Sequence, residues 1–502
     1  MQHRLPALSP SPLPILFALT LLGCEETPSR RPLTDASQHV GDFDGAQAKD
    51  GTQVKDDAHG GGETLPHGDG VVPPRPTWAS RFGGLGGETV FDGTLDKTEN
   101  LLLTGTFSGT WHLAKGDISA VGAGDIFVAK IDPNGNMLWA TSAGGSSSDE
   151  AYAISAADDG TVFITGDYGG KATFGATTLT PTKTDVFVAK LDASGKFLWA
   201  KSLGGSEIEV ARGVAADGSG GTYVVGRYEG MAHFGTHSLT ASPAGKAHGF
   251  VARLDAKGAV LWAVDIGSPG EASCHDVILA KSGPVISGWF TGSVDIAGTQ
   301  LTSQGETDGF VAKLDPAGKT IWATAIARGT ASGWGGELAL SGDNIVVAGS
   351  FRETATFGKT SLTSKDAVDF YVTALDTTGK VLWASTAGGD GNALAFCVAT
   401  GSAGEIIIAG TLSKSTTIGG KALVPHKGGG DILIAKFSSD GKAIWATSGG
   451  GDGGDRAYGV VVSPTEKKIY ALGNFEGEAT FGSDTIQAQG NSDIVVWKLN
   501  LP

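Results

Sequence analysis

Cysteine and methionine are scarce in this chain of 502 residues, which has three of each, and long helical patterns of apolar residues are almost absent. What the sequence has instead is 79 glycines and many short apolar runs separated by Gly, Asp, Asn and Ser. Such runs are typical of short strands joined by turns. Since 40% of the residues are hydrophobic, general disorder is excluded. The composition predicts an all-β fold.

A basic stripe is also missing. The chain has 37 Lys and Arg against 53 Asp and Glu, a net charge of −16, which argues against nucleic acid and against anionic lipid as partners of the folded part. The signatures G-x-S-x-G and H-E-x-x-H and zinc-spaced Cys or His clusters do not occur. We therefore predict a non-catalytic protein without a cofactor. The run GGGDGGD at 449–455 leaves calcium as the one metal to consider.

The N-terminus has a single apolar run, LPILFALTLL at 13–22. It is shorter than the ~20 residues of a membrane span and fits the core of a signal peptide. The residues Leu21, Leu22, Gly23 and Cys24 that close it resemble the bacterial lipobox. That resemblance implies removal of residues 1–23, lipid attachment at Cys24 and, because Glu25 follows, an outer-membrane lipoprotein. An ordinary signal peptide with a chance cysteine remains the alternative.

Residues 24–76 follow as an acidic segment rich in Gly and Pro. Such a composition does not bury enough apolar surface to offset the entropy of ordering the chain. We predict a disordered tether between the lipid and the folded body.

From residue 77 the sequence is periodic. The segment LDASGKFLWA at 191–200 has near-copies that start at 131, 254, 314, 375 and 437. Tryptophan recurs about every 61 residues, at Trp78, Trp139, Trp199, Trp262, Trp322, Trp383 and Trp445. A fixed period of this length, made of short strands, indicates a propeller or a solenoid.

One unit predicts four strands: residues 151–157, 161–168, 185–192 and 197–202, with a small extra hairpin at 171–179. Four strands with tight turns are typical of a propeller blade. The first Trp strand has no partner before it, and the last unit lacks its outer strand. We therefore expect residues 77–502 to form a seven-bladed β-propeller, closed by an N-terminal outer strand on the last blade.

The repeated segment is interpreted as structural. Asp-x-x-Gly suits a tight turn, in which Gly supplies a positive φ and Asp bonds the local backbone. The seven tryptophans lie on the predicted outer strands, where a large ring wedges between blades. They are the expected staples of the ring.

The repeat W-A-x-x-x-GG, followed by D-x-F-V-A-K-L-D-x-x-G-K-x-x-W, resembles the SBBP-type β-propeller repeats of bacterial exported proteins over residues 78–501. Its DxxGKxxW core also resembles the tryptophan-docking motif of quinoprotein-like propellers, which include outer-membrane assembly lipoproteins. In this chain the turn is one residue shorter and the period longer, which disfavours a quinone cofactor. The resemblance implies architecture more than activity.

The Gly-rich loops after each Trp carry the candidate binding residues, which we expect on one rim beside the central channel. They are Asp149, Glu150, Glu207, Glu209, Glu271, Asp390, Asp452 and Asp455. Soluble loops without a ligand are the alternative. Cys274 and Cys397 fall on inner strands two units apart, too far for a disulfide, and are expected to be buried free thiols.

The function predicted is a lipid-anchored, monomeric binding module for a protein or glycan at the cell envelope, on the surface or the periplasmic face. It would touch the membrane only through its N-terminal lipid. Two alternatives stay open: a periplasmic scaffold for outer-membrane assembly, and a polysaccharide-active enzyme that uses rim carboxylates.

Overall fold

The computed structural model describes residues 74–113, 116–329, 333, 335–364, 368–387, 393–426, 428–465 and 467–501. They belong to one unit, Val71–Pro502. The predicted signal peptide, the lipobox with Cys24, the tether up to residue 73, and Asp390 lie outside the described residues. Every regular element in these ranges is a strand, which confirms the all-β prediction. Accordingly, no helix within them is long and apolar enough to cross a membrane.

Strand pairing in the described ranges gives antiparallel groups of four, each named here by its first strand. The first three are β2 (Glu88–Leu95), β3 (Leu101–Phe107), β6 (Asp125–Ile131) and β7 (Met137–Gly145); β8 (Asp149–Ala156), β9 (Val162–Tyr168), β12 (Asp185–Leu191) and β13 (Phe197–Gly205); and β14 (Glu209–Ala216), β15 (Thr222–Glu229), β18 (Ala247–Leu254) and β19 (Val260–Pro269). The next two are β20 (Ala272–Ala280), β21 (Gly283–Phe290), β24 (Asp308–Leu314) and β25 (Thr320–Ile326); and β27 (Glu337–Ser341), β28 (Asn344–Phe351), β31 (Asp369–Leu375) and β32 (Val381–Ser385). The last two are β33 (Ala393–Thr400), β34 (Ile406–Leu412), β37 (Asp431–Phe437) and β38 (Ala443–Gly451); and β39 (Arg456–Val462), β40 (Lys468–Phe475), β43 (Asp493–Asn500) and β1 (Arg75–Phe82).

Short hairpins join the groups. The hairpin expected at 171–179 is present, but β10 pairs with β7, the outer strand of the preceding group, rather than with its own. The pairings β16 with β13, β22 with β19 and β41 with β38 repeat this arrangement. The short strands are β4 (Thr110–Trp111), β5 (Ile118–Ser119), β10 (Ala172–Phe174), β11 (Thr177–Leu179), β16 (Met231–Phe234), β17 (His237–Thr240), β22 (Ser293–Ile296), β23 (Thr299–Thr302), β26 (Arg328–Gly329), β29 (Thr354–Phe357), β30 (Thr360–Thr363), β35 (Thr416–Ile418), β36 (Lys421–Leu423), β41 (Glu478–Phe481) and β42 (Asp484–Gln487).

The β8 group illustrates why the repeat folds as it does. Its strands lie within three residues of the bounds expected from the sequence. The strand DVFVAKL is buried at every position, because it lies inside the group with a neighbour on each side. In the turn that follows, Oδ1 of Asp192 accepts the N–H groups of Ser194 and Lys196, and Gly195 has a φ of 85°. Asp and Gly thus reverse the chain without strain.

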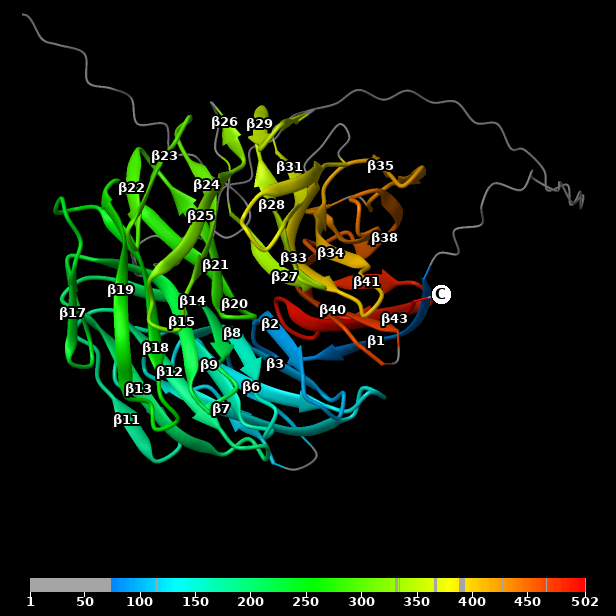
Figure 1. The fold of residues 1–502 in the computed structure, drawn as a ribbon. Helices are drawn as coiled ribbons and strands as arrows, with labels where there is room; N and C mark the ends of the chain where they lie inside the picture. Colours follow the sequence, from blue (N-terminus) through cyan, green and yellow to red (C-terminus); the bar gives the residue numbers. More distant parts are fainter. Residues whose placement is uncertain are drawn as a thin grey trace, which may run out of the picture. The chain divides into compact units, whose positions relative to one another are not determined.

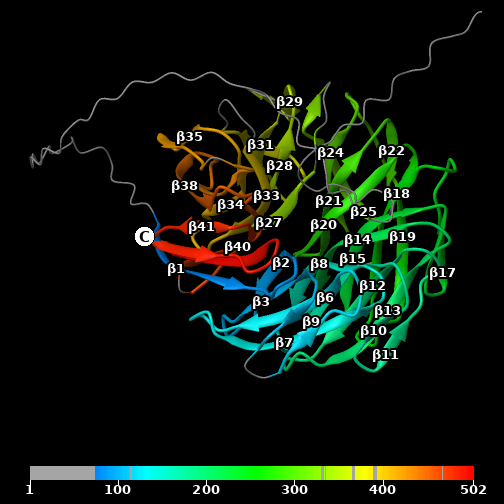
Figure 2. The same ribbon diagram turned by 180° about the vertical axis from the view of Figure 1, so that it is seen from behind.

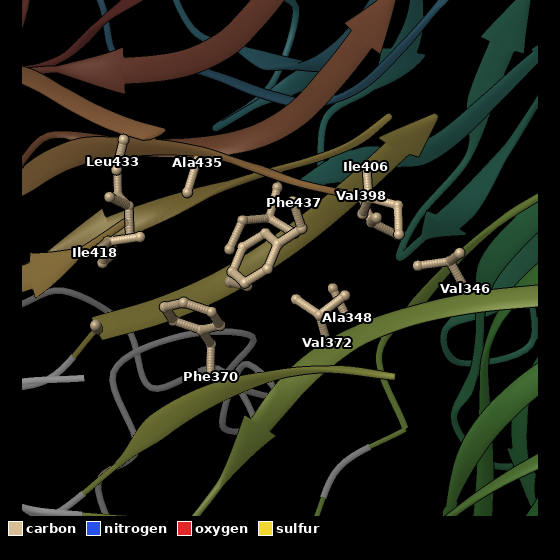
Figure 3. Close-up of a cluster of buried hydrophobic side chains, with 14 of the residues drawn as sticks. Val346, Ala348, Phe370, Val372, Val398, Ile406, Ile418, Leu433, Ala435 and Phe437 are labelled. Atoms are coloured by element: carbon tan, nitrogen blue, oxygen red, sulfur yellow. The ribbon is translucent and has the colours of Figure 1, made fainter. Parts of the chain in front are cut away.

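Neighbouring groups pack face to face through apolar side chains. Between the β27 and β33 groups, Phe370 and Phe437 meet edge to face with ring centroids 6.1 Å apart, beside Val372, Ile406 and Leu433 (Figure 3). A sheet with two apolar faces buries both only when it has a sheet on each side. Each group therefore depends on its two neighbours.

The first strands lie beside one another in chain order: β2, β8, β14, β20, β27, β33 and β39. β39 also contacts β2. At the outer side, β1 pairs with β43 from Arg75 opposite Asn500 to Phe82 opposite Ile494, and the two ribbons run side by side in both views (Figures 1 and 2). The N-terminal strand thus completes the last group of four.

Candidate binding site

A cavity of about 340 Å³ lies where the first strands face one another. Its lining comes from all of β2, β8, β14, β20, β27, β33 and β39. Ligand sites in proteins usually occupy about 300–1,000 Å³, so this cavity is at the small end of that range. We treat it as the candidate site.

β-Bulges recur on the first strands, and two of the residues that they insert, Tyr152 and Arg212, border the cavity. In six of the first strands the register shifts at the equivalent place, for example between Val90 and Asp92. A bulge inserts one extra residue and re-aims its side chain. The inserted residues are Phe91, Tyr152, Arg212, His275, Phe396 and Tyr458.

Four of these side chains form a chain of aromatic contacts, called here the aromatic tier. Phe396 stacks on Tyr458, with centroids 5.7 Å apart and planes at 15°. The ring centroid of Phe91 lies 6.1 Å from that of Tyr458 and 5.0 Å from that of Tyr152. The tier therefore joins β33, β39, β2 and β8 beside the cavity.

The guanidinium of Arg212 continues the tier. Its Cζ lies 4.3 Å from the centroid of Tyr152, a cation–π contact. The Tyr152 hydroxyl donates to the Glu150 carboxylate. Burial, and then the charge of Glu150, raises the pKa of the nearby Asp167 to about 7, while Arg212 opposes that shift. The guanidinium of Arg212 thus lies on an aromatic ring, and its charge acts on the buried Asp167.

Three carboxyl groups border the cavity from three strands: Asp92 of β2, Asp276 of β20 and Glu337 of β27. Asp92 accepts the N–H groups of Gly93 at 2.7 Å and Ile154 at 2.9 Å. Asp276 accepts those of Val277 at 2.6 Å and Leu338 at 2.8 Å. Each aspartate is therefore fixed by its own strand and by the neighbouring first strand.

These three carboxyl groups are unusually hard to ionise. Burial raises the pKa of Asp92 to about 7 and that of Asp276 to about 6, and repulsion from Asp276 adds to the shift of Asp92. Burial and repulsion from both also raise the pKa of Glu337. Burial therefore favours the neutral form of these acids, and the guanidinium of Arg212 borders the same cavity.

Three of the predicted rim carboxylates are buried instead. Asp149, Glu209 and Asp455 have no exposed surface. Each accepts the N–H of the second glycine of a Gly-Gly pair: Gly145, Gly205 and Gly451, at 2.7–2.8 Å. A Cβ at these glycines would collide with the backbone of the hairpin that pairs there. These three acids therefore fix the backbone where the loop meets the paired hairpin.

The remaining predicted rim residues do not gather at one point. Glu207 pairs with Lys183 at 2.9 Å and Glu271 with Lys246 at 3.1 Å. Glu150 accepts from Tyr152, and Asp452 is exposed beside a separate hollow near Glu476 and Glu478. No three His, Cys, Asp or Glu side chains of the described ranges are placed to hold one metal ion.

The tryptophans lie on the outer strands. For five of them the indole N–H donates to a backbone carbonyl in the tight turn of the next group, at 3.0–3.2 Å: Trp139, Trp199, Trp262, Trp322 and Trp383. The turn is Asp-x-x-Gly in the first four and begins with Ser438 in the last. Trp78 lies against Gly135 of such a turn, and Trp445 is buried against the last group. Cys274 and Cys397 are buried free thiols on β20 and β33, as predicted.

The inserted residues were missed by sequence reasoning, although the repeat contains a signal for them. Phe91 comes 13 residues after Trp78, and Tyr152 comes 13 after Trp139. The same spacing leads to Arg212, His275, Phe396 and Tyr458. The position 13 residues after these tryptophans is therefore constant in spacing but varied in residue type, and it marks the inserted residue of the first strand.

No known protein-family model matches this sequence. It is 23% identical to an uncharacterized WD repeat-containing protein of Acanthamoeba polyphaga mimivirus, over 79% of this chain and 36% of that protein. It is 26% identical to the regulatory protein FlaEY of Caulobacter vibrioides, over 70% of this chain and 42% of that protein. The chain thus spans less than half the length of these relatives. Among solved structures, the β-propeller domain of the Trilobed protease from Pyrococcus furiosus is similar, with a TM-score of 0.41 and 9% identity over 84% of this chain and 94% of that one.

Proposed function

We propose that the described strands are the blades of a seven-bladed β-propeller closed by β1, of the SBBP-like repeat type. The order of the first strands, with β39 beside β2, supports a closed ring. The pairing of β1 with β43 supports closure through an N-terminal outer strand. Such closure protects the strand edges that an open stack would expose.

We further propose that this propeller is a lipid-anchored, non-catalytic binding module for a protein or glycan at the bacterial cell envelope. The observation that carries the proposal is the cavity, because residues of seven different strands border it with unlike side chains. A position needed only for packing would tend to one residue type, as the outer tryptophans do. The similarity to a WD repeat-containing protein supports a repeat scaffold.

Binding is tested with the whole chain by co-sedimentation with outer-membrane vesicles and with isolated envelope polysaccharide. Arg212→Ala should weaken sedimentation at least tenfold, whereas Leu198→Ala, on an exposed outer strand, should leave it unchanged. Equal sedimentation of both variants with the parent protein would contradict a role for the cavity.

Anchoring and location need separate experiments. Labelling of cells with an alkyne fatty acid should mark the parent protein and not Cys24→Ser. Protease added to intact cells should release the propeller if it lies on the surface. Release only after the outer membrane is opened would favour the periplasmic face.

A further inference from the structure

We propose that Glu88 and Asp493 form a pH-sensitive latch on the closing strand β1. The two carboxyl groups share one proton in mildly acidic solution, and release of that proton to water as the pH rises loosens β1. The inference rests on the proposed closure of the ring by β1 and adds a condition under which that closure weakens. It does not depend on what the propeller binds.

The two carboxyl groups face one small space where three strands meet. Glu88 is the first residue of β2, Asp493 is the first residue of β43, and both are fully buried. A Cβ at Gly83, just after β1, would lie 2.5 Å from Oε2 of Glu88 and 3.1 Å from Oδ1 of Asp493. Ionised carboxylates only accept hydrogen bonds, so a hydrogen bond between the two acids requires one proton.

The groups around Asp493 favour its ionised form. Nη1 of Arg81, on β1, pairs with Oδ2 of Asp493 at 2.5 Å. The backbone N–H groups of Gln489 and Gly490 donate to the same carboxylate. Hydrogen bonds and an opposite charge both stabilise a carboxylate over the acid. The shared proton therefore belongs to Glu88, and the ion pair that holds β1 lies directly beside it.

The surroundings of Glu88 favour its neutral form. Burial raises the pKa of Glu88 from 4.5 to about 7, the charge of Asp493 and a hydrogen bond to it add to the shift, and Trp111 of β4 opposes it. The other strands beside Glu88 present neutral groups. Phe107 of β3 lies opposite it, and the amide of Asn474, on β40, donates to its backbone carbonyl.

The same arrangement recurs between the β33 and β39 groups, which indicates that it is a built feature. Asp431 begins β37, and Asp455 lies just before β39. A Cβ at Gly450 would lie 2.5 Å from Oδ2 of Asp455 and 3.0 Å from Oδ1 of Asp431. Nδ1 of His426 lies 2.9 Å from Oδ2 of Asp431. Each pair thus has a basic side chain on the acid of the third strand.

The direction of the pH effect follows from the shift of Glu88. Gly83 covers the pair, so opening of β1 exposes Glu88 to water and returns its pKa toward 4.5. Below that value both the closed and the open state hold the proton, and the latch contributes fully. Between about pH 4.5 and 7 only the closed state holds it, so the hold on β1 weakens as the pH rises.

The test is hydrogen exchange of the whole chain, measured by mass spectrometry on peptides that cover β1. From pH 5.5 to 7.5 the protection factor of β1 in the parent protein should fall at least about tenfold. Glu88→Gln carries a side-chain donor at every pH, so its protection factor should change less than about threefold. Glu306→Gln, which alters an exposed carboxyl before β24, is the matched control and should behave as the parent does.

A second variant keeps the proposal testable if Glu88→Gln does not fold. Ala393 stands at the equivalent position of the β33 group, ten residues after Trp383 and opposite Asp369, so the fold accepts alanine there. Glu88→Ala should therefore fold and should also lose the pH dependence of β1. At pH 6 the infrared difference spectrum, parent minus Glu88→Ala, should contain the band of a protonated carboxyl group.

The outcomes separate the latch from the closure on which it rests. Equal protection of β1 at both pH values in the parent protein would overturn the latch and leave the closure standing. A pH dependence like the parent's in both Glu88 variants would also overturn it. Absence of protection at both pH values would overturn the latch and contradict closure by β1 as well.

Discussion

The outer and the first strands of the same groups differ in how their residues repeat. On the outer strands, tryptophan returns in all seven groups, and five of the seven donate a hydrogen bond to the turn of the next group. On the first strands, the inserted residue changes from Phe91 to Tyr152, Arg212 and His275. The position on the outer strand and the position on the first strand both recur along the chain, but only the outer one keeps the same residue type.

The difference reflects what each position contacts. A Cβ at Gly195 would lie 2.6 Å from Cε3 of Trp139, so the turn and the ring fit only as a pair. Each outer tryptophan packs against the same kind of turn, so the same residue type suits every outer strand. The inserted residues meet different neighbours, since Phe91 contacts two tyrosines whereas Arg212 lies on the ring of Tyr152, so the packing does not require one residue type. In a repeat protein, positions that break the repeat therefore point to the site.

The largest effect is expected when the indole ring of one outer-strand tryptophan is removed. Trp139→Ala should lower the free energy of unfolding by about 3 kcal/mol, because a large, partly buried ring and its hydrogen bond are lost. Urea unfolding followed by far-UV circular dichroism measures this. Leu198→Ala, 51% exposed on the next outer strand, is the control and should stay within about 0.5 kcal/mol of the parent. A similar loss of unfolding free energy in both variants would mean that the contact of Trp139 with the next group does not stabilise the fold more than an exposed leucine does.

The turn glycine tests whether the seam is a matched pair. Gly195→Ala should cost about 2 kcal/mol, since its φ of 85° strains a residue with a Cβ and the new methyl meets the Trp139 ring. In the Trp139→Ala background the cost should fall, because only the backbone strain remains. Unfolding of the two single variants and the double variant supplies the cycle. Strict additivity would contradict the contact.

Much of the fold was predictable because it depends on local, repeated chemistry. Asp192 and Gly195 fix a turn by themselves, and the short apolar runs between such turns mark the strands. The pairing of β10 with β7 was not predictable in this way. Residues 171–179 read equally well as a hairpin of either group, and only the three-dimensional approach of Gly144 and Gly145 decides.

The site was less predictable, because exposure is a property of the folded chain. Glu209 and Glu207 read alike in the sequence as loop acids, yet one is fully buried on Gly205 and the other pairs with Lys183 in solvent. Asp92 and Asp276 lie 184 positions apart and meet only around the cavity. Their convergence requires the ring order of the first strands, which no single unit encodes.

The buried acids that accept a glycine N–H recur near the start of several first strands. They test whether a residue type that repeats there also serves the stability of the fold. Burial, with smaller contributions from Asp185 and Glu207, raises the pKa of Glu209 from 4.5 to about 8. Between those values the folded state holds a proton that the unfolded state releases, so stability falls as pH rises, by up to about 1.4 kcal/mol per pH unit, and levels off above about pH 8. Glu209→Gln carries no such proton and should reduce this fall. Unfolding at pH 5.5, 7 and 8.5 measures it, and Glu271→Gln, which removes a carboxyl that pairs with Lys246 in another loop, should keep the parent's slope.

The smallest expected effect is at the aromatic tier. Phe396 stacks on Tyr458 but is only partly buried, so Phe396→Leu keeps most of its apolar volume and loses the ring contact. We expect a cost of about 1 kcal/mol, within the range for one aromatic pair. The same substitution should weaken affinity for envelope material, because the tier supports the ring of Tyr152 through Tyr458 and Phe91. A stability loss as large as that of Trp139→Ala, with unchanged affinity, would mean that the inner tier is a second structural seam and that its varied chemistry carries no binding role.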